Sequence, residues 1–105
     1  MSVAFLCCIR YNSITMRQCV IEVSGNVQGV FFRDFTRREA ERLRITGWVK
    51  NELDGSVTIV AQGGEAFLKK FIARVRQGPP RARVDFVSVR WEESKEAFPH
   101  FEIVR

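Results

Sequence analysis

Residues 25–33, a short stretch with two glycines that ends in an arginine, have the composition of an anion-binding turn. Gly25 and Gly29 leave the backbone free to turn tightly and to present N–H groups to a ligand. Arg33 adds a guanidinium with five donors where a charged, helix-like run begins. Backbone amides, a helix N-terminus and a guanidinium all favour a compact oxyanion such as a phosphoryl group. The stretch therefore indicates a phosphate-binding loop.

The same spacing also has an explanation without function. Short glycine-containing turns between a strand and a helix are common, and Arg33 could be a solvated charge on a first helical turn. The pattern of residues 25–33 alone gives both interpretations similar weight.

The hydrophobic pattern predicts which elements position this stretch. Alternating apolar residues predict strands, and apolar residues at three- and four-residue spacings predict helices. The sequence Asp54-Gly55 between two strand-like runs predicts a hairpin turn. The predicted elements are a strand over 19–23, a helix from 32 or 33 to about 44, strands over 48–51 (begun by Gly47) and 57–61, a second helix that opens at residues 63–64 and stops at 78–80, and strands over 84–91 and 98–104.

This order predicts a ferredoxin-like α+β sandwich, in which an antiparallel sheet carries two helices on one face and an additional C-terminal strand. In this topology the first two strands run in the same direction, and the third strand lies between them. The end of the second strand, at Asn51, should then lie at the same edge of the sheet as the loop over 25–32. Two motifs that are distant in sequence are expected to form one site.

Two blocks of the sequence resemble the signatures of the acylphosphatase family, and the resemblance covers about residues 17–105. The first block contains Gly25, Val27, Gln28, Gly29, Val30, Phe32 and Arg33, and the second contains residues 47–51, residues 55–57 and Gly63. The resemblance implies an acylphosphate phosphohydrolase, which cleaves the carboxyl-phosphate bond of small acyl phosphates to carboxylate and inorganic phosphate. Since a carboxylate is a good leaving group, positioning and charge stabilisation can suffice, and we expect no metal and no cofactor.

The resemblance also implies the site residues. Arg33 binds the phosphate and Asn51 orients the attacking water. Thr36 either steadies the loop by hydrogen bonding or is a plain threonine on the helix. The expected phosphate-binding residues are Gly25, Asn26, Val27, Gln28, Gly29, Val30, Phe31, Phe32 and Arg33. Asn26 and Phe31 differ from the usual family pattern, and Glu52 adds a negative charge after Asn51.

Covalent mechanisms find no support in the sequence. Phosphatases that use a cysteine place it six residues before their arginine, and Val27 occupies that position. A nucleotide-binding glycine loop would end in Gly-Lys-Ser or Gly-Lys-Thr, which is missing. We expect His100 to be a surface residue rather than a general base.

The net charge of +5 favours anionic ligands. The arginines of the first helix are interleaved with acidic residues, and Asp34 can pair with Arg38, so this face resembles a solvated surface more than a nucleic-acid groove. The alternative is a non-catalytic ferredoxin-like module that binds an anionic ligand or RNA. Sheet-face RNA binding needs exposed aromatic residues, which the strand with Thr58 and Val60 lacks. We expect an acyl phosphate substrate, competition by inorganic phosphate or sulfate, no nucleic acid, no membrane and a monomer.

The remaining features concern domains and location. Residues 1–15 match the rest of the chain poorly, and we expect a functionless N-terminal extension before an acylphosphatase-like domain over 16–105. Cys7, Cys8 and Cys19 form neither a metal-ligand spacing nor an even disulfide framework, and Cys19 should be a buried apolar group. No apolar run is long enough to cross a bilayer. These features predict a cytoplasmic protein with reduced thiols.

Overall fold

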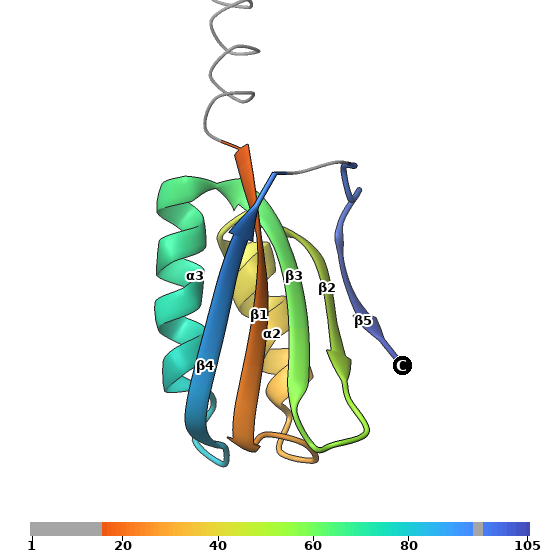
Figure 1. Ribbon diagram of the computed structural model, residues 1–105, viewed down its shortest axis with the longest axis vertical. Helices are drawn as coiled ribbons and strands as arrows, with labels where there is room; N and C mark the ends of the chain where they lie inside the picture. Colours follow the sequence, from red (N-terminus) through yellow and green to blue (C-terminus); the bar gives the residue numbers. More distant parts are fainter. Residues whose placement is uncertain (1–15, 94–95) are drawn as a thin grey trace, which may run out of the picture.

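The computed structural model describes residues 16–93 and 96–105, which form a five-stranded sheet with both helices on one face (Figure 1). The strands lie in the order β4-β1-β3-β2-β5. The predicted ferredoxin-like arrangement with an additional strand is confirmed. In chain order the elements are β1 Met16–Asn26, α2 Phe32–Arg42, β2 Thr46–Asn51, β3 Val57–Gly64, α3 Glu65–Gln77, β4 Arg83–Glu92 and β5 Phe101–Val104.

The core lies between the sheet and the two helices. Alternate residues of β1, β2 and β3 point into it, as the two-residue period of a strand requires. The predicted apolar stripe of α3 packs against them. The fully buried side chains of this core include Cys19, Ile21, Val23, Val49, Val57, Ile59, Ala61, Leu68, Phe71 and Val75.

Strand β3 lies between β1 and β2 and is antiparallel to both. The strands β1 and β2 therefore run in the same direction. Their C-terminal ends, Asn26 and Asn51, reach the same edge of the sheet. The convergence expected from the order of the elements is present.

The direction of the last strand differs from the prediction of an antiparallel sheet. β5 pairs with β2 in parallel, so the sheet is mixed. The reason is that β4 ends at the edge where β2 begins, and β5 starts at that same edge, where Phe101 pairs with Gly47 (Figure 1). The chain then re-enters the sheet in the direction of β2. The buried side chain of Gln62 fixes this connection, because it donates to the Glu96 carbonyl and accepts from the Phe98 N–H at 3.1 Å.

Helix α2 ends at Arg42 rather than at about residue 44. The Ile45 N–H donates to the Ala40 carbonyl at 2.8 Å, and the Arg44 N–H donates to the Glu41 carbonyl at 3.2 Å. These two bonds form a Schellman motif, whose left-handed position is usually a glycine. Arg44 occupies that position with φ of 59°, so the usual sequence signal for the end of a helix is missing.

Gly47 lies inside β2, which begins one residue earlier than predicted, at Thr46. Its φ is 140°, and a Cβ atom at this position would lie 1.9 Å from the Val60 carbonyl oxygen. The close approach of β3 requires a residue without a side chain here.

Candidate active site

The chain leaves β1 through residues 27–31, the 27–31 loop, and enters α2 at Phe32. Two loop residues have left-handed backbone conformations, Gly29 with φ of 73° and Phe31 with φ of 64°. For Phe31 this conformation costs about 1–2 kcal/mol, because its Cβ atom crowds the backbone. No side chain of the described residues caps the N-terminus of α2, so none of them takes up its first N–H groups. A strained loop that leads into an uncapped helix is suited to hold an anion.

Arg33 and Asn51 line the same pocket, whose volume is about 330 Å³. Arg33 lies in the first turn of α2, and Asn51 is the last residue of β2. The tertiary structure therefore brings the two sequence motifs together. The other residues that line this pocket, called the Arg33–Asn51 pocket below, are Val27, Gly29, Phe31, Phe32, Asp34, Ile103 and Arg105.

The guanidinium of Arg33 is available to a ligand. Arg33 is half-buried, and its side chain forms no ion pair or hydrogen bond with any residue in 16–93 or 96–105. The adjacent carboxylate of Asp34 pairs with Arg37 at 3.0 Å and with Arg38 at 3.1 Å, as expected for Arg38. Since two arginines offset the charge of Asp34, this carboxylate does not neutralise Arg33.

Asn51 contributes a buried acceptor. Its side-chain oxygen Oδ1 has no hydrogen-bond partner in the described part of the chain. A buried polar atom in this state costs about 1–3 kcal/mol, which a donor from a bound molecule would offset. An asparagine amide can accept from one molecule and donate to another. Asn51 is therefore suited to orient a small polar ligand in the pocket.

The first two predicted loop residues, Gly25 and Asn26, belong to the end of β1. They pair with Val84 and Arg83 of β4 and do not line the pocket. The φ of Gly25 is 134°, and a Cβ atom there would lie 2.1 Å from the Arg83 carbonyl oxygen. The close approach of β4 thus accounts for this glycine without any ligand.

Gln28 links the 27–31 loop to the turn between β2 and β3. Its Nε2 atom donates to the Glu52 carbonyl at 2.7 Å and to the Ser56 carbonyl at 2.9 Å. These bonds hold the loop beside the residue that follows Asn51. The Gln28 side chain therefore positions the loop, and Gln28 is not one of the residues that line the pocket.

Two further predicted residues have contacts away from the pocket. Val30 packs against the hydrophobic core. Thr36 is fully buried, and its hydroxyl donates to the Phe32 carbonyl at 2.9 Å, a bond within α2. Thr36 thus supports the first turn of the helix, next to a residue that lines the pocket.

Other side chains that could react lie outside the pocket. His100 is exposed and lies 2.9 Å from the Glu102 carboxylate, which confirms the expected surface position. Burial raises the pKa of the Cys19 thiol to about 11, mainly by desolvation, so this thiol is protonated at neutral pH. Its expected burial is confirmed, whereas Cys7, Cys8 and the extension over 1–15 lie outside the described residues.

Ile103 and Arg105 line the pocket, and sequence reasoning did not identify them. They belong to no motif, and their proximity depends on the pairing of β5 with β2. Within 16–93 and 96–105, no three His, Cys, Asp or Glu side chains are grouped to hold a metal ion. No helix in the described residues has the length and apolar character to cross a bilayer.

The fold and the pocket define a ferredoxin-like α+β protein with a pocket suited to an anion at one edge of its sheet. The family model for acylphosphatases matches residues 19–103. The chain is 46% identical over 91 residues to an acylphosphatase of Salinibacter ruber, covering 87% of this chain and 96% of the relative. It is 53% identical over 83 residues to an acylphosphatase of Archaeoglobus fulgidus, covering 79% of this chain and 92% of the relative.

A solved structure agrees with these sequence comparisons. The crystal structure of acylphosphatase from Bacillus subtilis matches with a TM-score of 0.83 at 43% identity, covering 85% of this chain and 99% of that chain. The chain belongs to the acylphosphatase family. The predicted enzyme class, a hydrolase of acyl phosphates, is therefore confirmed in preference to a non-catalytic binding module.

Proposed function

We propose that this chain hydrolyses the carboxyl-phosphate bond of small acyl phosphates without a metal ion, using Arg33 and the 27–31 loop to bind phosphate and Asn51 to orient water. One observation carries the assignment of these roles. Arg33 and Asn51 line one small pocket, and neither the Arg33 guanidinium nor the buried Asn51 Oδ1 atom has a partner within 16–93 and 96–105. One is a donor that suits a phosphoryl oxygen, and the other is an acceptor that suits water.

Binding of the phosphoryl group uses fixed positive charge. The N–H groups of the loop and of the first turn of α2 donate to its oxygens, and the guanidinium of Arg33 donates two further bonds. These donors are in place before the substrate arrives, so little reorganisation is needed during the reaction.

The chemical step needs one water molecule. Asn51 accepts a hydrogen bond from the water, whose oxygen attacks phosphorus, and the bond between phosphorus and the acyl oxygen breaks. The acyl group leaves as a carboxylate, the phosphoryl group becomes inorganic phosphate, and one proton passes to solvent. Because Asn51 is neutral, it does not repel the bound anion as a carboxylate would.

Hydrolysis in the presence of excess chelator tests the proposal. We expect the release of inorganic phosphate from acetyl or benzoyl phosphate to be as fast with chelator as without it. Inorganic phosphate and sulfate should both compete with the substrate. Activity that appears only after addition of a divalent cation would overturn the metal-independent mechanism.

We further propose that the enzyme is a cytoplasmic monomer. Two features of the sheet support a monomer: β5 is short, and the edge strand β4 carries the charged residues Arg83, Asp85 and Arg90. The buried, protonated thiol of Cys19 suits a reducing compartment. Light scattering should give the mass of one chain, 12.1 kDa, and a mass of twice that value would contradict the monomer.

A further inference from the structure

The Arg33–Asn51 pocket contains a second arginine from a different element. Arg105 follows β5 and lines the pocket together with Arg33 and Asn51. Its side chain, like that of Arg33, has no ion pair or hydrogen bond with the described residues. Two arginines whose guanidinium groups have no acidic partner within 16–93 and 96–105 therefore line one pocket, and Arg105 is the more exposed of the two.

The pairing of the strands places Arg105 beside Asn51. The last paired residues of β2 and β5 are Lys50 and Val104, which lie side by side in a parallel ladder. Asn51 is the next residue of β2, and Arg105 directly follows the last residue of β5. Since alternate residues of a strand share a face, Arg105 continues the face of Ile103, which also lines the pocket. Figure 1 shows the C-terminal end next to the arrowhead of β2.

The charge of the substrate calls for more than one cation. A phosphoryl group carries up to two negative charges at neutral pH. Arg33 supplies one positive charge, and a helix N-terminus contributes about half a charge. Arg37 and Arg38 are engaged with Asp34 and do not supply the remainder. We propose that Arg105 is a second phosphate-binding residue, which offsets the second negative charge of the phosphoryl group.

The size of the pocket supports this role. A volume of about 330 Å³ lies near the lower end of the range for ligand sites, roughly 300–1,000 Å³. Arg105 and Arg33 line the same pocket, so a phosphoryl group bound to Arg33 shares this volume with Arg105. The inference rests on the proposed function of Arg33 and Asn51.

The direction of attack distinguishes the two ends of the substrate. The attacking and leaving oxygens lie roughly in line on opposite sides of phosphorus. Asn51 orients the water, so the acyl group leaves on the side away from Asn51. Because Arg105 adjoins Asn51, it lies on the water side and faces the phosphoryl oxygens rather than the acyl group.

Inhibition by two tetrahedral anions tests the role of Arg105. Sulfate carries two negative charges and methanesulfonate carries one, so their inhibition constants are compared for wild type, Arg105→Gln and Arg105→Lys, with acetyl phosphate as substrate. Arg105→Gln should raise the inhibition constant of sulfate about tenfold, which corresponds to about 1.4 kcal/mol. It should raise the inhibition constant of methanesulfonate less than about threefold. The KM for acetyl phosphate should rise about tenfold with little change in kcat, and Arg105→Lys should restore most of the loss.

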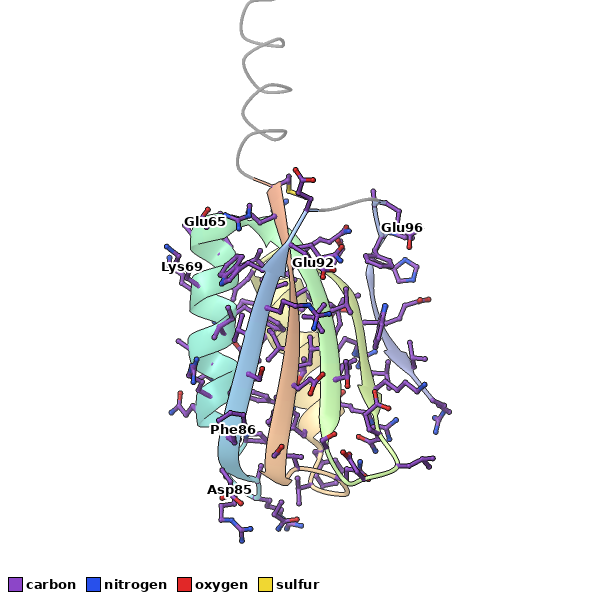
Figure 2. All side chains as sticks on the ribbon, viewed as in Figure 1. Glu65, Lys69, Asp85, Phe86, Glu92 and Glu96 are labelled. Atoms are coloured by element: carbon purple, nitrogen blue, oxygen red, sulfur yellow. The ribbon has the colours of Figure 1, made fainter. Side chains whose placement is uncertain are left out.

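The control is Lys69→Gln, which removes one positive charge elsewhere. Lys69 pairs with Glu65 at 3.2 Å near the N-terminal end of α3, away from the 27–31 loop (Figure 2). Both anions should inhibit this variant as strongly as they inhibit wild type. That result would exclude an effect of net charge. Thermal melts check that all variants are folded, and Arg105→Lys keeps the test valid if Arg105→Gln unfolds.

Three outcomes would overturn the role of Arg105. The first is unchanged inhibition of Arg105→Gln by sulfate. The second is an equal rise in the inhibition constants of sulfate and methanesulfonate. The third is a loss confined to an acyl phosphate with a second carboxylate, such as succinyl phosphate, which would assign Arg105 to the acyl end. A wild-type enzyme that needs a metal would instead contradict the proposed function, so the two failures are distinguishable.

Discussion

The guanidinium of Arg33 is free because its neighbours are paired with one another. Asp34 is the adjacent carboxylate, and it is held by Arg37 and Arg38 on the following turn of α2. Each of these exposed pairs contributes little to stability, typically less than about 1 kcal/mol. Their effect on the site is larger, because they keep a negative charge from cancelling the positive charge that we propose binds the phosphate.

At the residue scale, the two proposed roles predict different kinetic defects. Arg33→Gln should weaken inhibition by phosphate and lower activity together, because it removes a binding charge. Asn51→Ala should lower kcat while phosphate inhibition is largely retained, because it removes only the group that orients water. Each variant should lose about 2.7–4 kcal/mol of transition-state stabilisation, measured from kcat/KM.

The control for both variants is again Lys69→Gln, which should have the kcat and KM of wild type. Normal turnover of Asn51→Ala would contradict the water-orienting role. If Arg33→Gln retained normal inhibition by phosphate, the anion would have to be bound by other groups.

At the scale of elements, the site depends on how α2 and β2 are attached to the sheet. The bonds of Gln28 to Glu52 and Ser56 join the loop before α2 to the turn after β2. At the other end of α2, Glu39 accepts bonds from Arg42 and from Arg74 of α3. Although desolvation opposes it, hydrogen bonding from these arginines lowers the pKa of Glu39. The helix is thus fixed at both ends relative to the pocket.

The end of α2 offers a stability prediction. Arg44 adopts φ of 59°, which costs about 1–2 kcal/mol for a residue with a Cβ atom, whereas glycine lacks this penalty but loses more backbone entropy. Arg44→Gly should therefore raise the free energy of unfolding by about 1 kcal/mol. For a domain of this size the thermal midpoint should rise by roughly 4–8 °C.

The matched control is Arg44→Ala, which removes the charge but keeps the Cβ atom and should give no such gain. Activity should be unchanged in both variants, since Arg44 follows the end of α2 remote from Arg33. Equal midpoints for the glycine and alanine variants would show that backbone strain at this position is not the cause.

At the scale of the whole molecule, the described sheet begins at Met16. β1 begins at Met16, which pairs with Gly64, and the described core is built from residues after this point. We predict that a chain that starts at Met16 keeps the thermal midpoint of the full chain within about 2 °C and keeps its kcat/KM. The reason is that no described contact of the core or pocket is removed.

Calorimetry and acetyl phosphate hydrolysis on the two chains measure this directly. A further truncation that also removes the first three residues of β1, to start at Cys19, is the contrasting control. It deletes Arg17, whose guanidinium pairs with Glu65 and lies 5.0 Å from the Trp91 ring centroid, so it should be less stable. Loss of folding or activity in the Met16 chain would assign a role to residues 1–15.

The sequence by itself determined the parts of this protein that depend on near neighbours in the chain. The alternation of β1, the stripe of α3 and the Asp54-Gly55 turn each follow from residues within one element, and all are present. The two family motifs likewise pointed to Arg33 and Asn51. Local propensity and motif chemistry are written over a few consecutive residues, so they can be interpreted without the fold.

Only the tertiary structure decided which distant groups meet. The parallel pairing of β5 with β2 brought Arg105 to the pocket, and the carbonyl partners of Gln28 lie 24 and 28 positions away in sequence. The tertiary structure also explains Gly25 and Gly47. Each must be a glycine because the backbone of a neighbouring strand passes too close for a Cβ atom, and no ligand is needed to account for it. Register and close packing depend on the simultaneous fit of many elements, and no single stretch of sequence contains that information.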